Sequence, residues 1–324
     1  MKKIYITRRI PEIGVHMLQE KGYEVDINPH DRILEKSELI EAVSQKPYDA
    51  VLSLLTDQID KEVFDAVPSA KIFANYAVGF NNFNIADAKD RGVTLTNTPG
   101  MSSDTVGEHA VAMLLALTSR ILEGDAYIRA GKYKGWNPML LMGTDLEDLT
   151  VGIVGGGRIG YRAAHILGKG FGMKIAYYDV QRSEPFEKDL GAVFYENLDE
   201  LLKVSDIVSL HVPLLESTHH LINSRRLALM KPTAFLINTA RGAVIDETAL
   251  VEVLRNKTIA GAGLDVFEHE PELAPGLTEF SNVILTPHIA SSTVKTRDQM
   301  AIRATTNIID FLEGKVPQDV VVEN

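Results

Sequence analysis

Arg241, Glu270 and His288 are the side chains whose chemical types and places in the chain best suit one reaction, because each follows a short apolar segment. We interpret those segments as strands, and ligands bind beyond the carboxyl ends of strands in open α/β sheets. A guanidinium binds a carboxylate bidentately, and an imidazole exchanges protons near neutral pH. The set predicts reduction of a 2-oxo acid: Arg241 binds the substrate carboxylate, His288 protonates the carbonyl oxygen, and Glu270 orients the imidazole.

A glycine-rich motif predicts where a dinucleotide binds. Gly155, Gly157 and Gly160 form the pattern G-x-G-x-x-G, which follows an apolar strand and leads into a helical pattern. Gly155 permits a tight turn, Gly157 lets the backbone approach a pyrophosphate, and Gly160 lets the helix pack closely on the strand. The backbone N–H groups at the start of that helix bind the anion.

Asp179 indicates which dinucleotide is preferred. It ends the strand that follows the glycine motif, about 20 residues after Gly160. A carboxylate there accepts hydrogen bonds from a ribose 2′-hydroxyl and repels a 2′-phosphate. We therefore predict NAD as the cofactor, with NADH preferred over NADPH. Arg182 lies close enough in the sequence to weaken that preference.

Each catalytic candidate has a plainer role when it is considered alone. Arg241 could form a surface ion pair, Glu270 could be solvated, and His288 could be a structural histidine; Asp265 could cap a turn. Their occurrence together in one cofactor-binding half favours the catalytic interpretation. No metal site is expected, because no histidine pair has suitable carboxylate spacing.

The pattern of strands and helices predicts how these side chains are positioned. The first hundred residues alternate short apolar strands with helical patterns, and a second such series starts at Leu149. We expect an α/β fold with two domains: a Rossmann-type doubly wound cofactor domain (residues 100–288) and a discontinuous, flavodoxin-like substrate domain (residues 1–99 and 289–324). A capping box at Thr105-Val-Gly-Glu108 is predicted to open a long helix, and Gly131–Leu146, which holds Trp136, is predicted to be a loop.

Composition excludes several other classes of function. The chain of 324 residues is long enough for two domains, with 45% hydrophobic and 24% charged residues. The net charge is −11 and no basic tract stands out, so neither nucleic acid nor a membrane is an expected partner. The absence of cysteine excludes disulfides and thiolate catalysis. With no signal-peptide pattern at the start, we expect a cytoplasmic protein.

These segments together resemble the D-isomer-specific 2-hydroxyacid dehydrogenases, a family that includes D-lactate, glyoxylate/hydroxypyruvate and phosphoglycerate dehydrogenases. The resemblance extends over essentially all 324 residues. Besides the glycine motif, it rests on Asn75-Tyr-Ala-Val-Gly79, Asn97-Thr-Pro99, Ser209-Leu-His-Val-Pro213, Asn238-Thr-Ala-Arg241-Gly, Gly263-Leu-Asp-Val-Phe267, Glu268-His-Glu-Pro271 and Thr286-Pro-His288.

The resemblance implies roles for individual residues. Arg241, Glu270 and His288 would be catalytic, and Val78 and Gly79 would offer backbone N–H groups to the substrate carboxylate when the domains close. Arg241 and His288 would also contact the substrate. Asp265 is the expected partner of the nicotinamide carboxamide. The residues implied to bind the cofactor are Thr105, Gly155, Gly157, Arg158, Ile159, Gly160, Asp179, His211, Pro213, Thr218, Thr239, Ala240 and Asp265.

The resemblance also bears on partners and substrate. It implies a homodimer joined through the cofactor domain, with the Trp136 loop either lent to the neighbouring subunit or packed within its own chain. The segments Ile6–Pro11 and Ala74–Gly79 look most like glyoxylate/hydroxypyruvate reductases. D-lactate dehydrogenase, phosphoglycerate dehydrogenase and an NADH-sensing, corepressor-like regulatory protein are the alternatives. D-lactate relatives often carry an aromatic residue where this chain has Met101.

Overall fold

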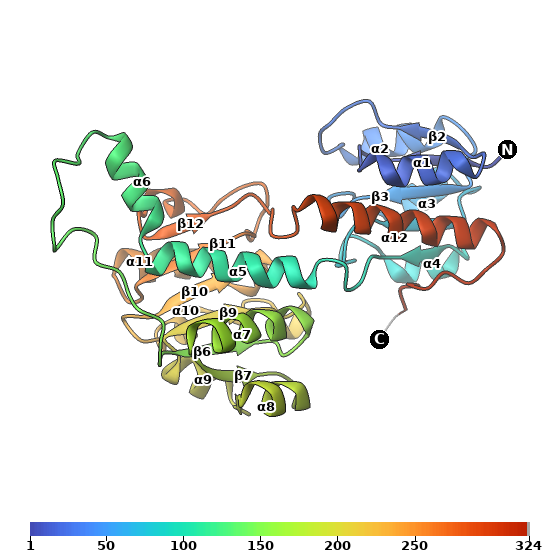
Figure 1. Cartoon of the computed structure of the whole chain (residues 1–324). Helices are drawn as coiled ribbons and strands as arrows, with labels where there is room; N and C mark the ends of the chain where they lie inside the picture. The colour runs from blue at the N-terminus through green and yellow to red at the C-terminus, as the bar shows by residue number, and fades with distance from the viewer. Residues whose placement is uncertain (323–324) are drawn as a thin grey trace. The chain divides into compact units, whose positions relative to one another are not determined.

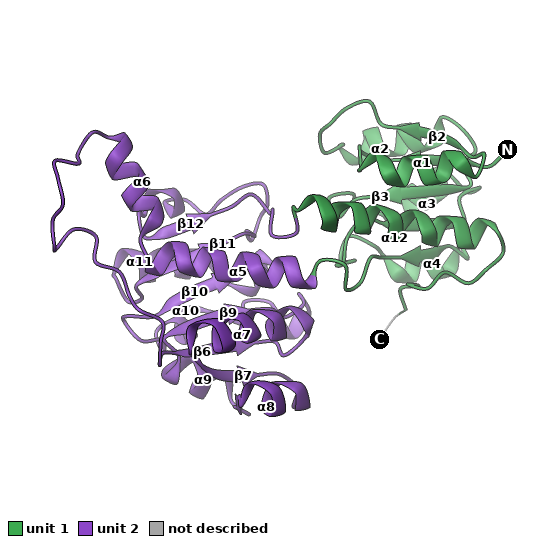
Figure 2. Ribbon diagram, in the orientation of Figure 1, with its two compact units in different colours: residues 1–102, 292–324 green, residues 103–291 purple. Residues whose placement is uncertain are grey.

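The computed structural model describes residues 1–322 and divides them into two compact units (Figure 2). Unit 1 comprises Met1–Ser102 and the segment that begins at Ser292, and unit 2 comprises Ser103–Ser291. The chain therefore passes between the units within three residues of the predicted positions, 99/100 and 288/289.

Unit 1 is built on a parallel sheet of five strands in the order β2-β1-β3-β4-β5, the flavodoxin-like order (Figure 1). The strands are β1 (Lys3–Ile6), β2 (Glu24–Ile27), β3 (Ala50–Ser53), β4 (Ile72–Asn75) and β5 (Thr94–Thr96). The helices are α1 (Glu12–Glu20), α2 (Lys36–Ser44), α3 (Lys61–Ala66), α4 (Ile85–Asp90) and α12 (Val294–Leu312). Helices α1 and α12 cover one face of the sheet, and α2, α3 and α4 cover the other.

Helix α12 belongs to unit 1 because of its apolar stripe. Met300, Ala301, Ala304 and Ile308 recur at helical spacing and are buried against α1 and the sheet. Thr293 caps the helix by accepting a hydrogen bond from the backbone of its third residue. The predicted return of the chain to the first domain follows from this stripe.

Unit 2 is built on a parallel sheet of seven strands in the order β12-β11-β10-β9-β6-β7-β8. The strands are β6 (Thr150–Val154), β7 (Lys174–Tyr178), β8 (Val193–Phe194), β9 (Ile207–Leu210), β10 (Phe235–Asn238), β11 (Gly261–Leu264) and β12 (Val283–Leu285). The order reverses between β6 and β9, and in such sheets ligands bind at the reversal. The predicted α/β fold is confirmed.

Helices cover both faces of the second sheet. The α-helices are α5 (Ser103–Thr118), α6 (Ile121–Arg129), α7 (Arg158–Phe171), α8 (Glu184–Leu190), α9 (Leu198–Val204), α10 (Ser224–Leu227) and α11 (Glu247–Arg255), and the short 3-10 turns are η1 (Glu216–Thr218), η2 (Gly242–Val244) and η3 (Leu277–Glu279). Helices α5, α7 and α8 share one apolar core with the sheet, and α9, α10 and α11 share the other.

Two local predictions around α5 are wrong. The helix begins at Ser103, so Thr105 lies inside its first turn and does not cap it. In the sequence, Leu117 and Ile121 continue the helical spacing of apolar residues and predict one helix that reaches Ile121, but α5 ends at Thr118, and Arg120 adopts the left-handed conformation with φ 54°. A separate helix, α6, follows that break.

Helix α6 and the loop after it form an arm that stands away from the rest of unit 2 (Figure 1). No residue of α6 is buried, and residues 131–146 contain neither helix nor strand, as predicted for Gly131–Leu146. Trp136 in this loop is 83% exposed. Within residues 1–322, no single helix is long and apolar enough to cross a membrane; α5 and α6 pass that test only as a pair, bent by 58°.

Candidate active site

The glycine turn joins β6 to α7 at the point where the strand order reverses. Gly155 has φ 105°, and a Cβ there would lie 2.7 Å from the carbonyl carbon of His211. A Cβ at Gly160 would lie 2.2 Å from the Gly155 carbonyl oxygen. Gly157 differs, because a Cβ there meets no atom within 4 Å. Two of the glycines are therefore required by the turn itself, whereas Gly157 borders open space at the start of α7.

Asp179 closes one side of this turn at the end of β7. Its Oδ2 accepts a hydrogen bond of 2.6 Å from the backbone N–H of Gly156, and its Oδ1 accepts one of 2.6 Å from Val180. Arg182 is paired with Glu187 through two hydrogen bonds of 2.9 and 3.0 Å. A surface hollow next to the turn is lined by Tyr178, Asp179, Val180, Arg182, Phe194 and Glu196.

Two buried polar atoms beside the turn lack hydrogen-bond partners among the described residues. They are Nδ1 of His211, just after β9, and Oγ1 of Thr239, just after β10. The other ring nitrogen of His211 is 2.9 Å from the Ser209 hydroxyl, and burial lowers the pKa of His211 to about 4, so its ring is neutral. Buried polar atoms without partners are costly, so both atoms suit a polar ligand at the reversal of the sheet.

The remaining cofactor candidates lie at the start of α7, in the loops after β9 and β10, and in the first turn of α5. Arg158 and Ile159 open α7, and Ala240 donates from its backbone to the Asn238 side chain. The Thr218 hydroxyl accepts a hydrogen bond from the backbone of Leu215, and donates one to the Pro213 carbonyl, so it shapes the loop after β9. Thr105 lies in the first turn of α5.

His288 and Glu270 form a hydrogen-bonded pair. Glu270 Oε2 accepts a bond of 2.9 Å from His288 Nδ1, and Oε1 accepts one of 3.0 Å from the backbone of Phe267. Burial alone raises the pKa of Glu270, but the hydrogen bond and charge of His288, with a smaller effect of Arg241, hold that pKa below its ordinary value. The carboxylate is therefore ionised at neutral pH, and its hydrogen bond to Nδ1 fixes the orientation of the imidazole ring.

Asp265 holds the turn that carries His288. It is fully buried, and its carboxylate accepts hydrogen bonds of 2.6 Å from the Thr286 hydroxyl and 2.8 Å from the backbone N–H groups of both Ile289 and Ala290. Its carbonyl oxygen accepts a further bond of 2.9 Å from the backbone of His288. His288 itself has φ 53°, a left-handed conformation that the surrounding bonds must maintain. The sequence offered Asp265 two roles, partner of the cofactor and cap of a turn; these backbone contacts match the second, although their partners were not foreseen.

Arg241 lies at the start of η2, close to Glu270. Its guanidinium donates a bond of 2.7 Å to the Ala240 carbonyl, and no carboxylate of residues 1–322 lies within 4.0 Å of it. Burial lowers the pKa of Arg241, and the charge of Glu270 opposes that effect. A half-buried guanidinium of this kind remains charged and is suited to binding an anion.

Gly242 explains how the loops of Arg241 and Glu270 come together. A Cβ at this position would lie 1.8 Å from the carbonyl carbon of Phe267. Only glycine allows the loop after β10 to approach the loop after β11 so closely. The glycine that directly follows Arg241 was the sequence signal for this close approach, but from the sequence alone it was interpreted only as part of the segment Asn238-Thr-Ala-Arg241-Gly.

Val78 and Gly79 lie in unit 1, just after β4, and the structure describes that unit separately. Asn97 donates a hydrogen bond of 2.7 Å to the Val78 carbonyl, and Asn75 donates one of 2.9 Å to the Gly79 carbonyl. Both asparagines belong to segments that carried the family resemblance. Their side chains fix the loop that is the candidate for binding substrate.

Comparisons with known proteins show the family of the chain. Residues 111–290 match the family model described as D-isomer specific 2-hydroxyacid dehydrogenase, NAD binding domain. A glyoxylate reductase of Thermococcus litoralis is 46% identical over 323 residues, which cover 98% of this chain and 96% of that one. The crystal structure of a protein from Thermus thermophilus superposes with a TM-score of 0.93 at 41% identity, covering 99% of this chain and 100% of the other.

A third relative is described as NADPH-dependent. An NADPH-dependent glyoxylate/hydroxypyruvate reductase of Sinorhizobium meliloti superposes with a TM-score of 0.85 at 31% identity, covering 99% of this chain and 98% of the other. All three relatives span nearly the whole chain, which confirms the predicted family. The chain belongs to the D-isomer-specific 2-hydroxyacid dehydrogenases, oxidoreductases that act on CH–OH donors with a nicotinamide cofactor.

Proposed function

We propose that this enzyme reduces glyoxylate or hydroxypyruvate with NADH. One observation carries the proposal: a half-buried cation, Arg241, lies near a hydrogen-bonded His288–Glu270 pair at the edge of the sheet that holds the glycine turn. The name of the Thermococcus relative and that of the Sinorhizobium reductase support the choice of substrate.

The three side chains have distinct tasks in this mechanism. Arg241 binds the substrate carboxylate bidentately, because its guanidinium has no carboxylate partner within 4.0 Å among residues 1–322. His288 donates a proton from its second ring nitrogen to the carbonyl oxygen, while Glu270 holds the first. The nicotinamide, when bound, supplies the hydride. In the reverse direction His288 accepts the proton from the hydroxyl group.

The residues around the glycine turn fit a dinucleotide. Open space at Gly157 suits a pyrophosphate at the start of α7, and a bound cofactor would give partners to His211 Nδ1 and Thr239 Oγ1. Asp179 is the proposed partner of the ribose hydroxyls. Arg182 is occupied by Glu187, which leaves it poorly placed to bind a 2′-phosphate and supports NADH over NADPH.

Three finer assignments belong to the same proposal. Val78 and Gly79 bind the substrate carboxylate through their backbone when unit 1 closes on substrate. Asp265 binds the nicotinamide carboxamide in addition to holding the turn of His288. The enzyme is cytoplasmic and forms a homodimer through unit 2. The exposed apolar side chains of the arm support that dimer: Ile121, Leu122, Ile128, Tyr133, Trp136, Met139 and Met142.

A steady-state comparison tests the substrate and the class of function together. Glyoxylate, hydroxypyruvate, pyruvate and 3-phosphohydroxypyruvate are each assayed with NADH and with NADPH. We expect the highest kcat/KM for glyoxylate or hydroxypyruvate with NADH. A preference for pyruvate or for 3-phosphohydroxypyruvate would overturn the proposed substrate but leave the proposed reaction, reduction of a 2-oxo acid, in place. Tight NADH binding without turnover of any of the four would favour the regulatory alternative.

A further inference from the structure

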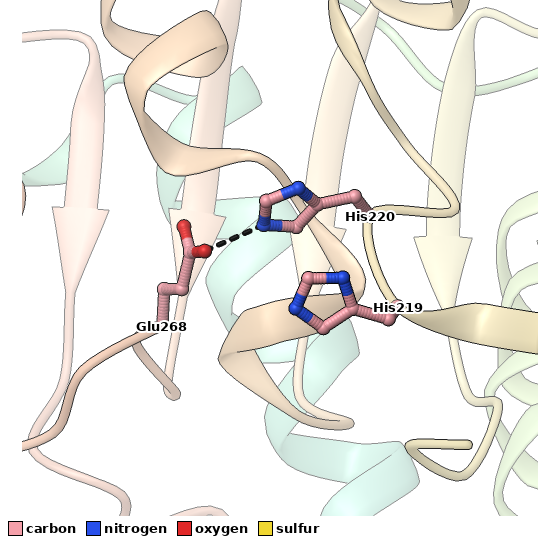
Figure 3. Close-up of side chains that lie close together, drawn as sticks. All are labelled: His219, His220 and Glu268. Carbon is pink, nitrogen blue, oxygen red and sulfur yellow. Dashed lines mark hydrogen bonds and ion pairs between the residues drawn. The ribbon is translucent and has the colours of Figure 1, made fainter. Parts of the chain in front are cut away.

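His219, His220 and Glu268 gather in unit 2, and none of them belongs to the catalytic pair (Figure 3). One ligand atom from each residue lies within 4.8 Å of the others. Glu268 Oε1 is 2.5 Å from His220 Nε2, and the two imidazole rings stack with centroids 4.1 Å apart. One nitrogen from each imidazole and one carboxylate oxygen therefore lie within 4.8 Å of one another.

The backbone around this cluster is held in place. Glu268 Oε2 accepts a hydrogen bond of 3.2 Å from the backbone of Glu247, whose own carboxylate accepts one of 2.8 Å from the backbone of Glu268. The backbone of His220 donates a bond of 2.8 Å to the Ala243 carbonyl, and φ at His220 is 48°. Outer hydrogen bonds to a ligating carboxylate are typical of metal sites, because they orient the ligand.

We propose that His219, His220 and Glu268 bind a divalent transition-metal ion, Zn²⁺ being the best match to this ligand set. Imidazole and carboxylate ligands suit Zn²⁺ in a four-coordinate, tetrahedral site at about 2.0–2.2 Å per bond. In that geometry the ligand atoms stand about 3.3 Å apart. The His220–Glu268 pair therefore opens by less than about 1 Å, which side-chain rotation can supply.

A fourth ligand is close by. His269 Nε2 lies 4.0 Å from the same Glu268 oxygen, and its side chain is 79% exposed, so it can turn toward the ion without displacing a packed neighbour. Water is the other candidate. Sequence reasoning expected no metal because Glu268 is 48 positions from His220, and only the fold brings them together.

The ion would join two loops that matter to the proposed reaction. His219 and His220 directly follow η1 in the loop after β9, where Pro213 and Thr218 lie, and Glu268 lies two positions before Glu270 in the loop after β11. A metal bound here stabilises the arrangement of both loops. The binding itself does not depend on the proposed substrate, so it can be tested without an activity assay.

The test uses the full chain freed of metal with a chelator and titrated with ZnCl₂ by isothermal calorimetry. We expect one ion per chain at this cluster. At a free Zn²⁺ concentration about 100-fold above Kd, the apparent Tm should rise by on the order of 5 °C. His219→Ala and Glu268→Gln should each weaken binding about tenfold or more, as the loss of even an outer partner weakens metal sites about 10–100-fold.

Two further variants locate the bound ion. His16→Ala removes an exposed histidine from α1 in unit 1 and should leave the affinity unchanged. His288→Gln should also leave it unchanged, because that histidine belongs to the catalytic pair. His219 is exposed, so its replacement leaves the fold intact. The proposal is overturned if the wild-type chain binds no Zn²⁺, if His219→Ala binds it equally well, or if only His288→Gln abolishes binding.

Discussion

At the scale of single residues, the His288–Glu270 pair gives the sharpest prediction. Replacing His288 by Gln removes the proton donor but leaves the glycine turn untouched, so kcat should fall about 10²–10⁴-fold. NADH affinity, measured by fluorescence titration, should stay within about twofold of wild type. His16→Gln, in unit 1, is the matched control. A variant that keeps its kcat would remove His288 from the mechanism.

Glu270 makes stability depend on pH in a direction that follows from its lowered pKa. A carboxyl group whose pKa is lower in the folded state stabilises the fold above its unfolded pKa, and that stabilisation is lost as pH falls through the folded value. The free energy of unfolding of the wild type should therefore exceed that of Glu270→Gln at pH 7. This difference should shrink as the pH falls below 4.5, the ordinary pKa of a glutamate. Urea denaturation of both proteins across that range measures it. A difference independent of pH would contradict the ionised pair.

The proposed preference for NADH over NADPH can be tested at Asp179 and at the Arg182–Glu187 pair. Asp179→Ala removes the repulsion of a 2′-phosphate, so the ratio of kcat/KM for NADH over NADPH should fall by about tenfold or more. Adding Glu187→Gln releases Arg182 from its two hydrogen bonds and should raise kcat/KM for NADPH further. If Asp179→Ala leaves the ratio unchanged, another residue decides the preference.

The sequence revealed the chemical types at this site more readily than their connections. Arg241, Glu270 and His288 follow strands in recognisable segments, and the structure brings Glu270 into contact with His288. The sequence allowed Asp265 to cap a turn, but which backbone groups it binds depends on the left-handed backbone at His288, which only the assembled turn reveals. Glu268 was not recognised as a partner of His220 because 48 positions separate the two residues in the sequence.

At the scale of elements, the strand–turn–helix of β6 and α7 separates packing from binding. Gly160→Ala places a Cβ 2.2 Å from the Gly155 oxygen, so it should cost about 1–3 kcal/mol of unfolding free energy and weaken NADH binding. Gly157→Ala meets nothing within 4 Å and has φ −73°, so Tm should stay unchanged while NADH binding weakens. Thermal denaturation and NADH titration of both variants test this. Loss of Tm in Gly157→Ala would argue against open space at that position.

Elements with clear periodicity were predictable, and breaks in them were not. The alternating strands and helices of both units follow from apolar patterns that the sheets bury on both faces. Helix α6 was missed because Ile121 continues the spacing of α5, and the turn at Arg120 depends on backbone geometry and leaves no sequence signal. Thr105-Val-Gly-Glu108 does not act as a capping box because the helix already begins at Ser103, two residues before Thr105.

At the scale of the whole molecule, the exposed apolar residues of the arm give a test of the proposed homodimer. Trp136→Ala should weaken the dimer about 30-fold or more, as buried tryptophans at interfaces often contribute at least about 2 kcal/mol. Val316→Ser, at an exposed apolar residue of unit 1, is the control and should leave the dimer unchanged. Sedimentation equilibrium measures both. A wild-type chain that is monomeric at micromolar concentration contradicts the proposed dimer.

The arm also carries an intrinsic fluorescence probe. Trp136 is the single tryptophan among 324 residues, and it lies on a projecting loop with most of its surface open to solvent. Light that excites indole but not tyrosine therefore interrogates this loop and nothing else in the chain. A blue shift of emission with rising protein concentration reports burial of the ring by a second subunit. No dye, label or engineered residue is needed to follow assembly.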